Sequence, residues 1–196
     1  MKSKKWIQRN SQDIYVKKAK NEGYLSRSAY KLIQIDNKYK ILKKSNKILE
    51  LGSAPGGWSQ VVCNFNKKVA IHSFDVLEMQ FKHPQIKFFK KDFFKFDIQL
   101  LNKEYDLILS DIAPNTTGHQ STDHLRIACI VQDIIALLKL VSLPKGNFIF
   151  KIWKGSEEKS ILNQLKKQYE KVSYYKPSSS RNESSEIFIV AENFIV

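Results

Sequence analysis

Cysteine is scarce in this chain of 196 residues, which contains only Cys63 and Cys129. The two thiols lie far apart in the sequence and show none of the paired spacings that form zinc sites or a disulfide framework. This scarcity excludes the small disulfide-stapled class of secreted proteins and predicts no metal site. A reducing compartment is the simplest expectation.

Long apolar runs are also missing from the sequence. The most hydrophobic candidate helix is interrupted by Gln132, Asp133 and Lys139, so no segment has the roughly 20 apolar residues that cross a bilayer. The first residues lack the apolar centre of a signal peptide, and Asp13 and Glu22 argue against a transit peptide. We expect a cytoplasmic protein with no membrane partner. A mitochondrial or other organellar location is the alternative if the source is eukaryotic.

Arginine is rare, because only four of the 33 basic residues are arginine and the others are lysine. With 19 acidic residues the net charge is +14 and the pI is near 9.6. A lysine-rich composition can reflect an A+T-rich genome, so the distribution of charge is more informative than its total. Residues 1–46 hold 13 basic residues against three acids, a net charge of +10. This concentration indicates a polyanionic partner such as RNA.

The order of apolar segments predicts the fold. We expect seven strands, at residues 48–51, 69–75, 87–92, 105–111, 146–153, 172–175 and 186–190. Helices are expected at residues 28–41, 58–65, from Ser121 or Thr122 to about 143, and 156–169, with further helices optional after the second and third strands. The apolar face of the third of these helices is assigned to Leu125, Ala128, Val131, Ile135 and Leu138. This alternation predicts a Rossmann-like α/β fold, a mostly parallel seven-stranded sheet with helices on both faces.

Two regions are expected within this chain. Residues 1–26 should form a basic N-terminal arm or helix that contacts RNA, and residues 27–196 a single α/β domain. No extra apolar face is evident in the pattern, so we expect a monomer.

Three of the seven glycines lie in the segment that follows the first predicted strand, at Gly52, Gly56 and Gly57. A strand, a glycine-rich turn and a helix together open a nucleotide-binding unit. Ala54 occupies the second glycine position of a dinucleotide fingerprint, and Pro55 lacks an N–H that could hold phosphate, so an NAD-linked oxidoreductase is disfavoured. The following helix N-terminus can still receive a carboxylate, which suits the methionine end of S-adenosylmethionine (SAM). A glycine-rich turn without a ligand is the alternative.

Acidic residues end two of the other predicted strands. Asp75 closes the second strand, where an acid binds ribose hydroxyls in nucleotide folds, and Asp92 closes the third, where a carboxylate can accept from an adenine amino group. Each acid alone could be a helix cap or turn residue. Together, at this interval after the glycine-rich loop, they indicate a SAM pocket.

A second group of charged residues is unusual because of its surroundings. Lys151 lies inside an apolar strand, where a buried ammonium group is costly unless it is paired or deprotonated. The alternative is a lysine that reaches solvent along its stem. Glu186 poses the same question in the last strand. If Lys31, Asp111, Lys151 and Glu186 converge, two cations and two carboxylates form a self-neutralising network beside the cofactor.

Five segments of the sequence, spread over nearly its whole length and in the same order, resemble one family. They are residues 26–32 (SRSAYKL), 51–60 (LGSAPGGWSQ), 110–118 (SDIAPNTTG), 150–153 (FKIW) and 176–190 (KPSSSRNESSEIFIV). The chain resembles the FtsJ/RlmE family of SAM-dependent ribosomal RNA 2′-O-ribose methyltransferases. The resemblance implies the SAM-dependent methyltransferase variant of the Rossmann-like fold, with SAM as methyl donor and no metal.

The resemblance also implies roles for individual residues. The Lys-Asp-Lys-Glu tetrad of the family falls on Lys31, Asp111, Lys151 and Glu186, with Lys151 as our candidate general base. The implied cofactor-binding residues are Gly52, Pro55, Gly56, Gly57, Trp58, Asp75, Asp92 and Asp111. The expected substrate is a ribose 2′-hydroxyl, most simply of a uridine in large-subunit rRNA. A tRNA ribose methyltransferase and a non-catalytic RNA-binding ribosome-assembly factor remain alternatives.

The basic N-terminal segment contains aromatic residues among its lysines, namely Trp6, Tyr15, Tyr24 and Tyr30. Cations bind phosphates and aromatic rings stack on unpaired bases, so this segment is the expected RNA platform. A solvated lysine-rich arm is the alternative. The loop Ser178–Arg181 is expected to add contacts near the catalytic residues.

Overall fold

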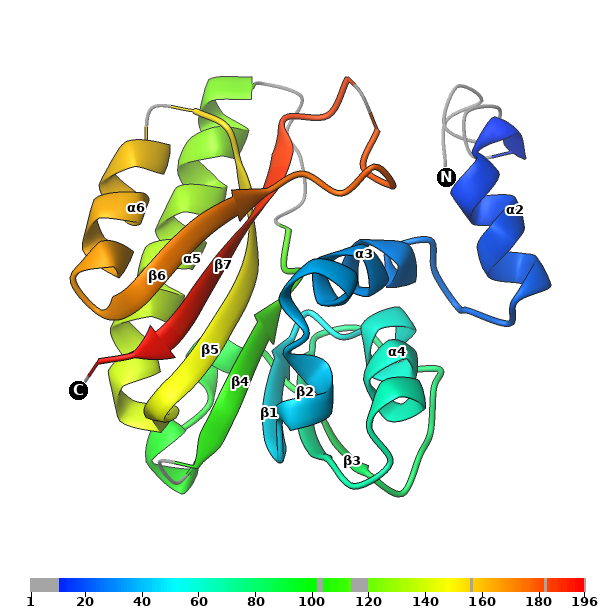
Figure 1. Cartoon of the computed structure of the whole chain (residues 1–196), viewed down its shortest axis with the longest axis horizontal. Coiled ribbons are helices and arrows are strands. Elements are labelled where there is room, and N and C mark those ends of the chain that lie inside the picture. Colours follow the sequence, from blue (N-terminus) through cyan, green and yellow to red (C-terminus); the bar gives the residue numbers. More distant parts are fainter. Residues whose placement is uncertain (1–10, 102–103, 114–119, 156, 182, 196) are drawn as a thin grey trace.

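The computed structural model describes residues 11–101, 104–113, 120–155, 157–181 and 183–195 (Figure 1). Within these residues lies a seven-stranded sheet with the order β3-β2-β1-β4-β5-β7-β6. Strands β1 to β5 run parallel, and β7 runs antiparallel to both of its neighbours, which confirms the mostly parallel sheet. The strands are β1 (Lys47–Leu51), β2 (Ala70–Asp75), β3 (Ile86–Lys90), β4 (Tyr105–Ser110), β5 (Ser142–Trp153), β6 (Tyr169–Tyr175) and β7 (Glu186–Phe194).

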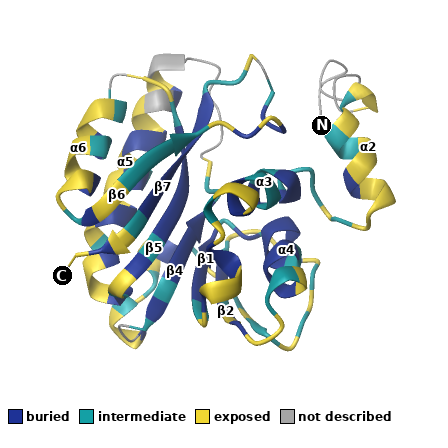
Figure 2. Cartoon of the chain, viewed as in Figure 1, coloured by how far each residue is buried: buried dark blue, intermediate teal, exposed yellow. Residues whose placement is uncertain are grey.

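Helices cover both faces of the sheet, as the alternating pattern predicts (Figure 1). Helices α3 (Ala29–Tyr39) and α4 (Gly57–Phe65) pack on one face, and α5 (Gln120–Val141) and α6 (Glu158–Lys166) on the other. Successive strand residues point to opposite faces, so Ile48 joins the apolar core under α3 and α4 while Leu49 joins the core under α5 and α6. The central strands are therefore buried on both sides (Figure 2).

The N-terminal segment contributes helix α2 (Ile14–Asn21), which lies beside α3. Asp13 caps α2 by accepting hydrogen bonds from the backbone N–H groups of Tyr15 and Val16. Residues 1–10, including Trp6, lie outside the described residues. So do Ser156 and residues 114–119, which include the second half of the family-like segment 110–118.

Some sequence-based boundaries were wrong. Tyr169 was assigned to a helix, but α6 ends at Lys166 and Tyr169 begins β6, where its buried ring packs on Phe194. Leu125 was placed on the apolar face of α5, but it is 54% exposed, and Ile127 and Ile134 are buried there instead. A tyrosine or leucine suits either environment by type, so only the packing distinguishes them.

The connections between strands also differ from the expectation in detail. Residues 76–85 form turns and extended chain without a helix, and the segment after β3 forms two short 3₁₀ helices, η2 (Phe93–Lys95) and η3 (Ile98–Leu100). A third, η1 (Leu42–Lys44), precedes β1. β5 starts at Ser142, directly after α5, so Pro144 and Gly146 lie within the strand, beside an irregularity in its register with β4. No helix in the described part of the chain is long and apolar enough to span a membrane.

Candidate active site

The carboxyl ends of three neighbouring strands, β1, β2 and β4, meet at one edge of the sheet. Leu51 at the end of β1 pairs with Phe74 of β2 on one side and with Ser110 of β4 on the other. The residues that follow these positions surround a cavity of about 470 Å³. Its lining consists of Gly52, Ala54, Phe74, Asp75, Val76, Leu77, Lys91, Asp92, Phe93, Phe94, Asp111, Ile112 and Ala113. In parallel α/β sheets, this edge is where ligands bind.

The two acids predicted at strand ends both line this cavity. Asp75 accepts a hydrogen bond from the backbone N–H of Ala54 at 2.8 Å and another from Leu77 at 2.8 Å, so its carboxylate also holds the glycine-rich loop in place. Asp92 accepts from the backbone N–H of Phe94 at 3.1 Å and caps η2. A carboxylate oxygen has two lone pairs, so a turn role leaves each acid able to accept from a ligand.

The glycines of the loop are required by contacts within the protein. Gly52 has a φ of 76°, and a Cβ on it would lie 2.8 Å from Cγ1 of Ile112 and 2.9 Å from its backbone nitrogen. Gly56 has a φ of 117°, and a Cβ there would lie 2.6 Å from Cβ of Phe81. Both positions combine a left-handed backbone with a close approach of another chain segment. These two glycines are therefore required by the packing of the protein itself, whether or not a ligand is bound.

Four of the predicted cofactor residues, Gly52, Asp75, Asp92 and Asp111, line the cavity. Pro55, Gly56, Gly57 and Trp58 are not among its described lining residues. The backbone carbonyl of Pro55 instead accepts from the N–H groups of Gln80 and Phe81.

The side chain of Trp58, one of the predicted cofactor-binding residues, lies in the core. Trp58 is 3% exposed, its indole Nε1 donates to the Ser28 carbonyl at 2.9 Å, and its ring lies 5.8 Å from that of Phe188. The indole therefore joins α4 to the start of α3 and to β7. Sequence reasoning also missed Phe93 and Phe94, apolar walls of the cavity whose only signal was their position directly after Asp92.

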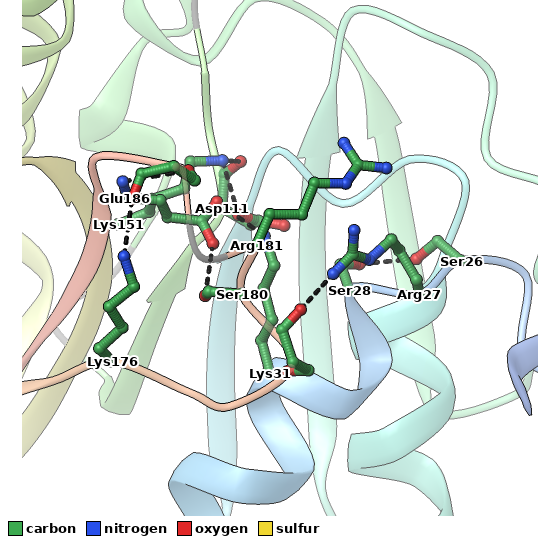
Figure 3. Close-up of polar contacts among 12 residues, drawn as sticks. Ser26, Arg27, Ser28, Lys31, Asp111, Lys151, Lys176, Ser180, Arg181 and Glu186 are labelled. Carbon is green, nitrogen blue, oxygen red and sulfur yellow. Dashed lines mark hydrogen bonds and ion pairs between the residues drawn. The ribbon is translucent and has the colours of Figure 1, made fainter. Parts of the chain in front are cut away.

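The four charged residues that the sequence singled out lie together (Figure 3). Nζ of Lys151 donates to Oδ1 of Asp111 at 2.6 Å and to its backbone carbonyl at 2.7 Å. Nζ of Lys31 donates to Oε2 of Glu186 at 2.7 Å, and the Ser180 hydroxyl donates to Oε1 of Glu186 at 2.9 Å. Because Lys151 is 7% exposed and paired, the alternative of a lysine that reaches solvent is wrong.

These four residues come from four different elements. Lys31 is on α3, Asp111 directly follows β4, Lys151 is on β5 and Glu186 begins β7. Burial alone would raise the pKa of the Asp111 carboxyl. The positive charges of Lys151 and Lys31 together lower that pKa by more, so it lies below the ordinary value. Lys31 therefore acts on both carboxylates, and the two ion pairs form one electrostatic unit.

A second cavity, of about 330 Å³, adjoins this unit at Lys31 and Glu186. It is lined by Arg27, Lys31, Arg181, Glu183, Ser184 and Glu186. Asp111 faces the first cavity, while Lys31 and Glu186 face the second. Three of the four residues thus line one cavity or the other, and Lys151, which lines neither, is paired with Asp111. An arrangement of this kind can bring two ligands to one group of charged side chains.

Glu50, on β1 beneath the glycine-rich loop, was missed by the sequence reasoning. It is 1% exposed, and its Oε2 accepts from the hydroxyls of Ser59 and Ser73, the latter at 3.0 Å. Burial raises its pKa to about 7, and the charge of Asp111 acts in the same direction. Its other oxygen has no hydrogen-bond partner within the described residues. The signal in the sequence was an acid inside an apolar strand.

Two tyrosines of the N-terminal segment, Tyr15 and Tyr24, pack against a third, Tyr30. The Tyr30 ring lies 5.4 Å from that of Tyr15 and 5.7 Å from that of Tyr24. Tyr30 is 4% exposed and its hydroxyl donates to Glu22, so its predicted role in stacking on a base is wrong. The predicted loop residues Ser178–Arg181 do lie beside the four charged residues, through the Ser180 contact.

No group of three or more histidine, cysteine or acidic side chains within the described residues is arranged to hold a metal ion.

Comparisons with known proteins agree with this geometry. The family model described as FtsJ-like methyltransferase matches residues 24–194. The ribosomal RNA large subunit methyltransferase E of Rickettsia bellii is 43% identical over 202 residues, which cover 97% of this chain and 88% of the relative. The protein of the same name from Rickettsia felis is 41% identical over 204 residues, with the same coverage.

Solved structures give the same result. The crystal structure of a protein described as a ribosomal RNA methyltransferase from Plasmodium falciparum superimposes with a TM-score of 0.75 at 31% identity, covering 87% of this chain and 98% of that one. The family model and the relatives both span almost the whole chain, including all seven strands and the four charged residues. This chain therefore belongs to the FtsJ-like methyltransferase family.

Proposed function

We propose that this protein transfers the methyl group of SAM to a ribose 2′-hydroxyl of large-subunit rRNA, most simply of a uridine. The observation that carries the proposal is the group of two ion pairs, of which Lys151 with Asp111 adjoins the first cavity and Lys31 with Glu186 lines the second. The names of the relatives support an rRNA substrate.

The first cavity suits SAM by the chemistry of its lining. Three carboxylates, Asp75, Asp92 and Asp111, supply acceptors for hydroxyl and amino groups, and Phe93 and Phe94 supply apolar surface of the kind that a purine ring covers. Asp75 would bind the ribose hydroxyls and Asp92 the adenine amino group. Asp111 lines the same cavity and is paired with Lys151. When bound, SAM supplies a methyl group made electrophilic by its sulfonium.

The protein has to align the 2′-oxygen and remove its proton. We assign Lys151 as the general base: Nζ takes the proton of the 2′-hydroxyl as the oxygen attacks, which requires a deprotonated amine when the substrate is in place. Asp111 accepts a hydrogen bond from Nζ and fixes its direction, and the positive charge of Lys31 favours the ionised form of this carboxylate. Lys31 and Glu186, on the side of the second cavity, orient the ribose. Alignment of this kind supplies a large part of many rate enhancements.

The basic surface of residues 1–26 is assigned to the RNA backbone, and residues 27–196 to the methyltransferase domain. Helix α2 carries three lysines, and Nζ of one of them, Lys18, lies 4.9 Å from the Tyr30 ring centroid and 3.8 Å from Oε1 of Glu22. An exposed lysine in a surface ion pair can give up its carboxylate partner for an RNA phosphate at little cost in free energy.

The decisive experiment is incorporation of tritiated methyl from SAM, with assembled large subunits, free large-subunit rRNA and tRNA supplied side by side. The proposal predicts label in large-subunit rRNA and, after nuclease mapping, on one 2′-oxygen. Label in tRNA alone would identify a tRNA ribose methyltransferase. SAM binding by calorimetry without label in any RNA would identify a non-catalytic assembly factor.

A further inference from the structure

Three charged side chains from distant parts of the chain meet beside the second cavity, which two of them, Arg27 and Arg181, line. Asp13 precedes α2, Arg27 precedes α3, and Arg181 lies between β6 and β7. A single oxygen of Asp13, Oδ2, accepts hydrogen bonds from Nη1 of Arg27 and from Nε of Arg181 at 3.2 Å, and it also forms an ion pair with Nη2 of Arg181 at 3.2 Å. The Asp13 side chain is 9% exposed, so this carboxylate is largely removed from water.

The two oxygens of Asp13 have separate partners. Oδ1 accepts from the backbone N–H groups of Tyr15 at 3.0 Å and Val16 at 3.3 Å, which caps α2. Oδ2 binds only the two arginines among its described partners. The arginine contacts can therefore be exchanged for another anion while Oδ1 continues to cap the helix.

The arginines have donors to spare. Nε of Arg27 is buried and has no hydrogen-bond partner within the described residues, and the Arg181 side chain is 27% exposed. Both guanidinium groups line the cavity that also holds Lys31 and Glu186 (Figure 3). Two guanidinium groups that converge on one anionic oxygen match the way proteins bind phosphate, because each presents a planar array of N–H donors.

We infer that Arg27 and Arg181 form a binding site for one phosphodiester group of the RNA strand next to the methylated nucleotide, and that Asp13 fills this site when RNA is absent. The inference rests on the proposed function, which makes RNA the substrate. Exchange of Asp13 Oδ2 for a phosphate oxygen replaces one monoanion by another, so the arginines never lose their counter-charge. Asp13 is thus an internal competitor, which weakens binding of any strand that makes too few other contacts.

The test uses the full chain, a fluorescently labelled single-stranded RNA oligonucleotide and anisotropy titrations over a range of KCl concentrations. Asp13→Asn removes the competing charge but keeps an oxygen that can cap α2, since asparagine and aspartate are equally good caps. We expect about three- to tenfold tighter RNA binding at low salt. Asp97→Asn is the matched control, because Asp97 likewise caps a helix, η3, with Oδ1, and its substitution changes the net charge equally. That variant should bind RNA as the unsubstituted protein does.

Arg181→Gln tests the site from the other side. It should weaken RNA binding and reduce the slope of log Kd against log salt concentration by about one, as expected for one lost phosphate contact. The gain in RNA affinity caused by Asp13→Asn should be smaller in the Arg181→Gln variant than in the unsubstituted protein, because only one of the two arginines that Asp13 releases is then present. Thermal melting of each variant checks that the fold is retained.

Two results would overturn the inference. Unchanged or weaker RNA binding by folded Asp13→Asn means that the carboxylate only anchors α2. An unchanged affinity and salt slope in Arg181→Gln means that no phosphate binds there. Methyl transfer measured on the same proteins separates this inference from the proposed function. If methyl groups are transferred to RNA but either of these results is found, the phosphate site is contradicted and the proposed function is not. If the expected binding changes are found without methyl transfer, the proposed function is contradicted and the phosphate site is not.

Discussion

Lys151 donates to Asp111 twice, to the carboxylate at 2.6 Å and to the backbone carbonyl at 2.7 Å. The two contacts fix the amine relative to both the side chain and the main chain at the end of β4. A nitrogen held in this way points in one direction without substrate, as expected for a group that has to meet an incoming hydroxyl.

Substitution of Lys151 by alanine tests its assignment as the base. We expect methyl transfer to fall by at least about 100-fold, because a positioned general base typically contributes that much. SAM affinity, measured by calorimetry, should change by only a few fold. Lys154→Ala, three residues along and exposed, is the control and should remain active. A Lys151→Ala variant with near-normal turnover would remove the base assignment.

The ion pair of Lys31 and Glu186 should contribute measurably to stability. Their side chains are 13% and 12% exposed, so either charge alone would be poorly solvated. We expect Lys31→Met and Glu186→Gln to show a coupling energy of about 1–3 kcal/mol in a double-mutant cycle of urea unfolding. The pair Lys18 and Glu22, 54% and 47% exposed, serves as the comparison and should couple by less than about 0.5 kcal/mol. Equal coupling in the two pairs would argue against a desolvated site.

Alanine substitutions at two glycines with the same φ can distinguish the cost of backbone strain from the cost of a steric clash. Gly52 and Gly23 both have a φ of 76°, but a Cβ on Gly52 would clash with Ile112 and one on Gly23 would meet nothing within 4 Å. Gly23→Ala should lose about 1 kcal/mol of unfolding free energy from its backbone alone. Gly52→Ala should lose about 1–3 kcal/mol more and also bind SAM less tightly, because Ile112 lines the cavity. Similar losses in chemical denaturation would show that the Ile112 contact relaxes freely.

Glu50 should make stability depend on pH. Its pKa of about 7 in the folded state lies above its ordinary value of 4.5, so the native protein holds this proton more tightly than the unfolded chain. The contribution of this proton to the free energy of unfolding is fully present below about pH 4.5 and is lost as the pH rises to about 7. Relative to Glu50→Gln, which imitates the protonated acid, the unsubstituted protein should lose about 2 kcal/mol between pH 5 and pH 8. Parallel stability curves would contradict the raised pKa.

Much of the fold could be predicted from the sequence because buried parallel strands are nearly continuous apolar runs. The strand containing Leu107 and the strand containing Ile149 were both placed correctly for this reason. Tyr169 was misplaced because its aromatic ring suits a helix face as well as a strand, and the choice depends on Phe194, which lies 25 residues further along in a different strand.

The site was predictable to the extent that its residues look wrong for their local surroundings. Lys151 was conspicuous among apolar neighbours, and its partner Asp111 follows a strand. Trp58 gave no such signal, since a tryptophan at the start of a helix serves a ligand or a core equally well. The association of Asp13 with Arg181 could not be read at all, because two ordinary surface-type residues 168 positions apart become partners only through the fold.

The place of β7 in the sheet has a consequence for how the protein is made. β7 follows β5 and β6 along the chain, yet it inserts between them in the sheet and brings Glu186 to Lys31. Until it arrives, β6 has no neighbour in the sheet order and Lys31 lacks its carboxylate partner. A chain synthesised only as far as β6 therefore contains Lys31, Asp111 and Lys151 without Glu186, and the group of four charged residues is complete only once β7 has been made.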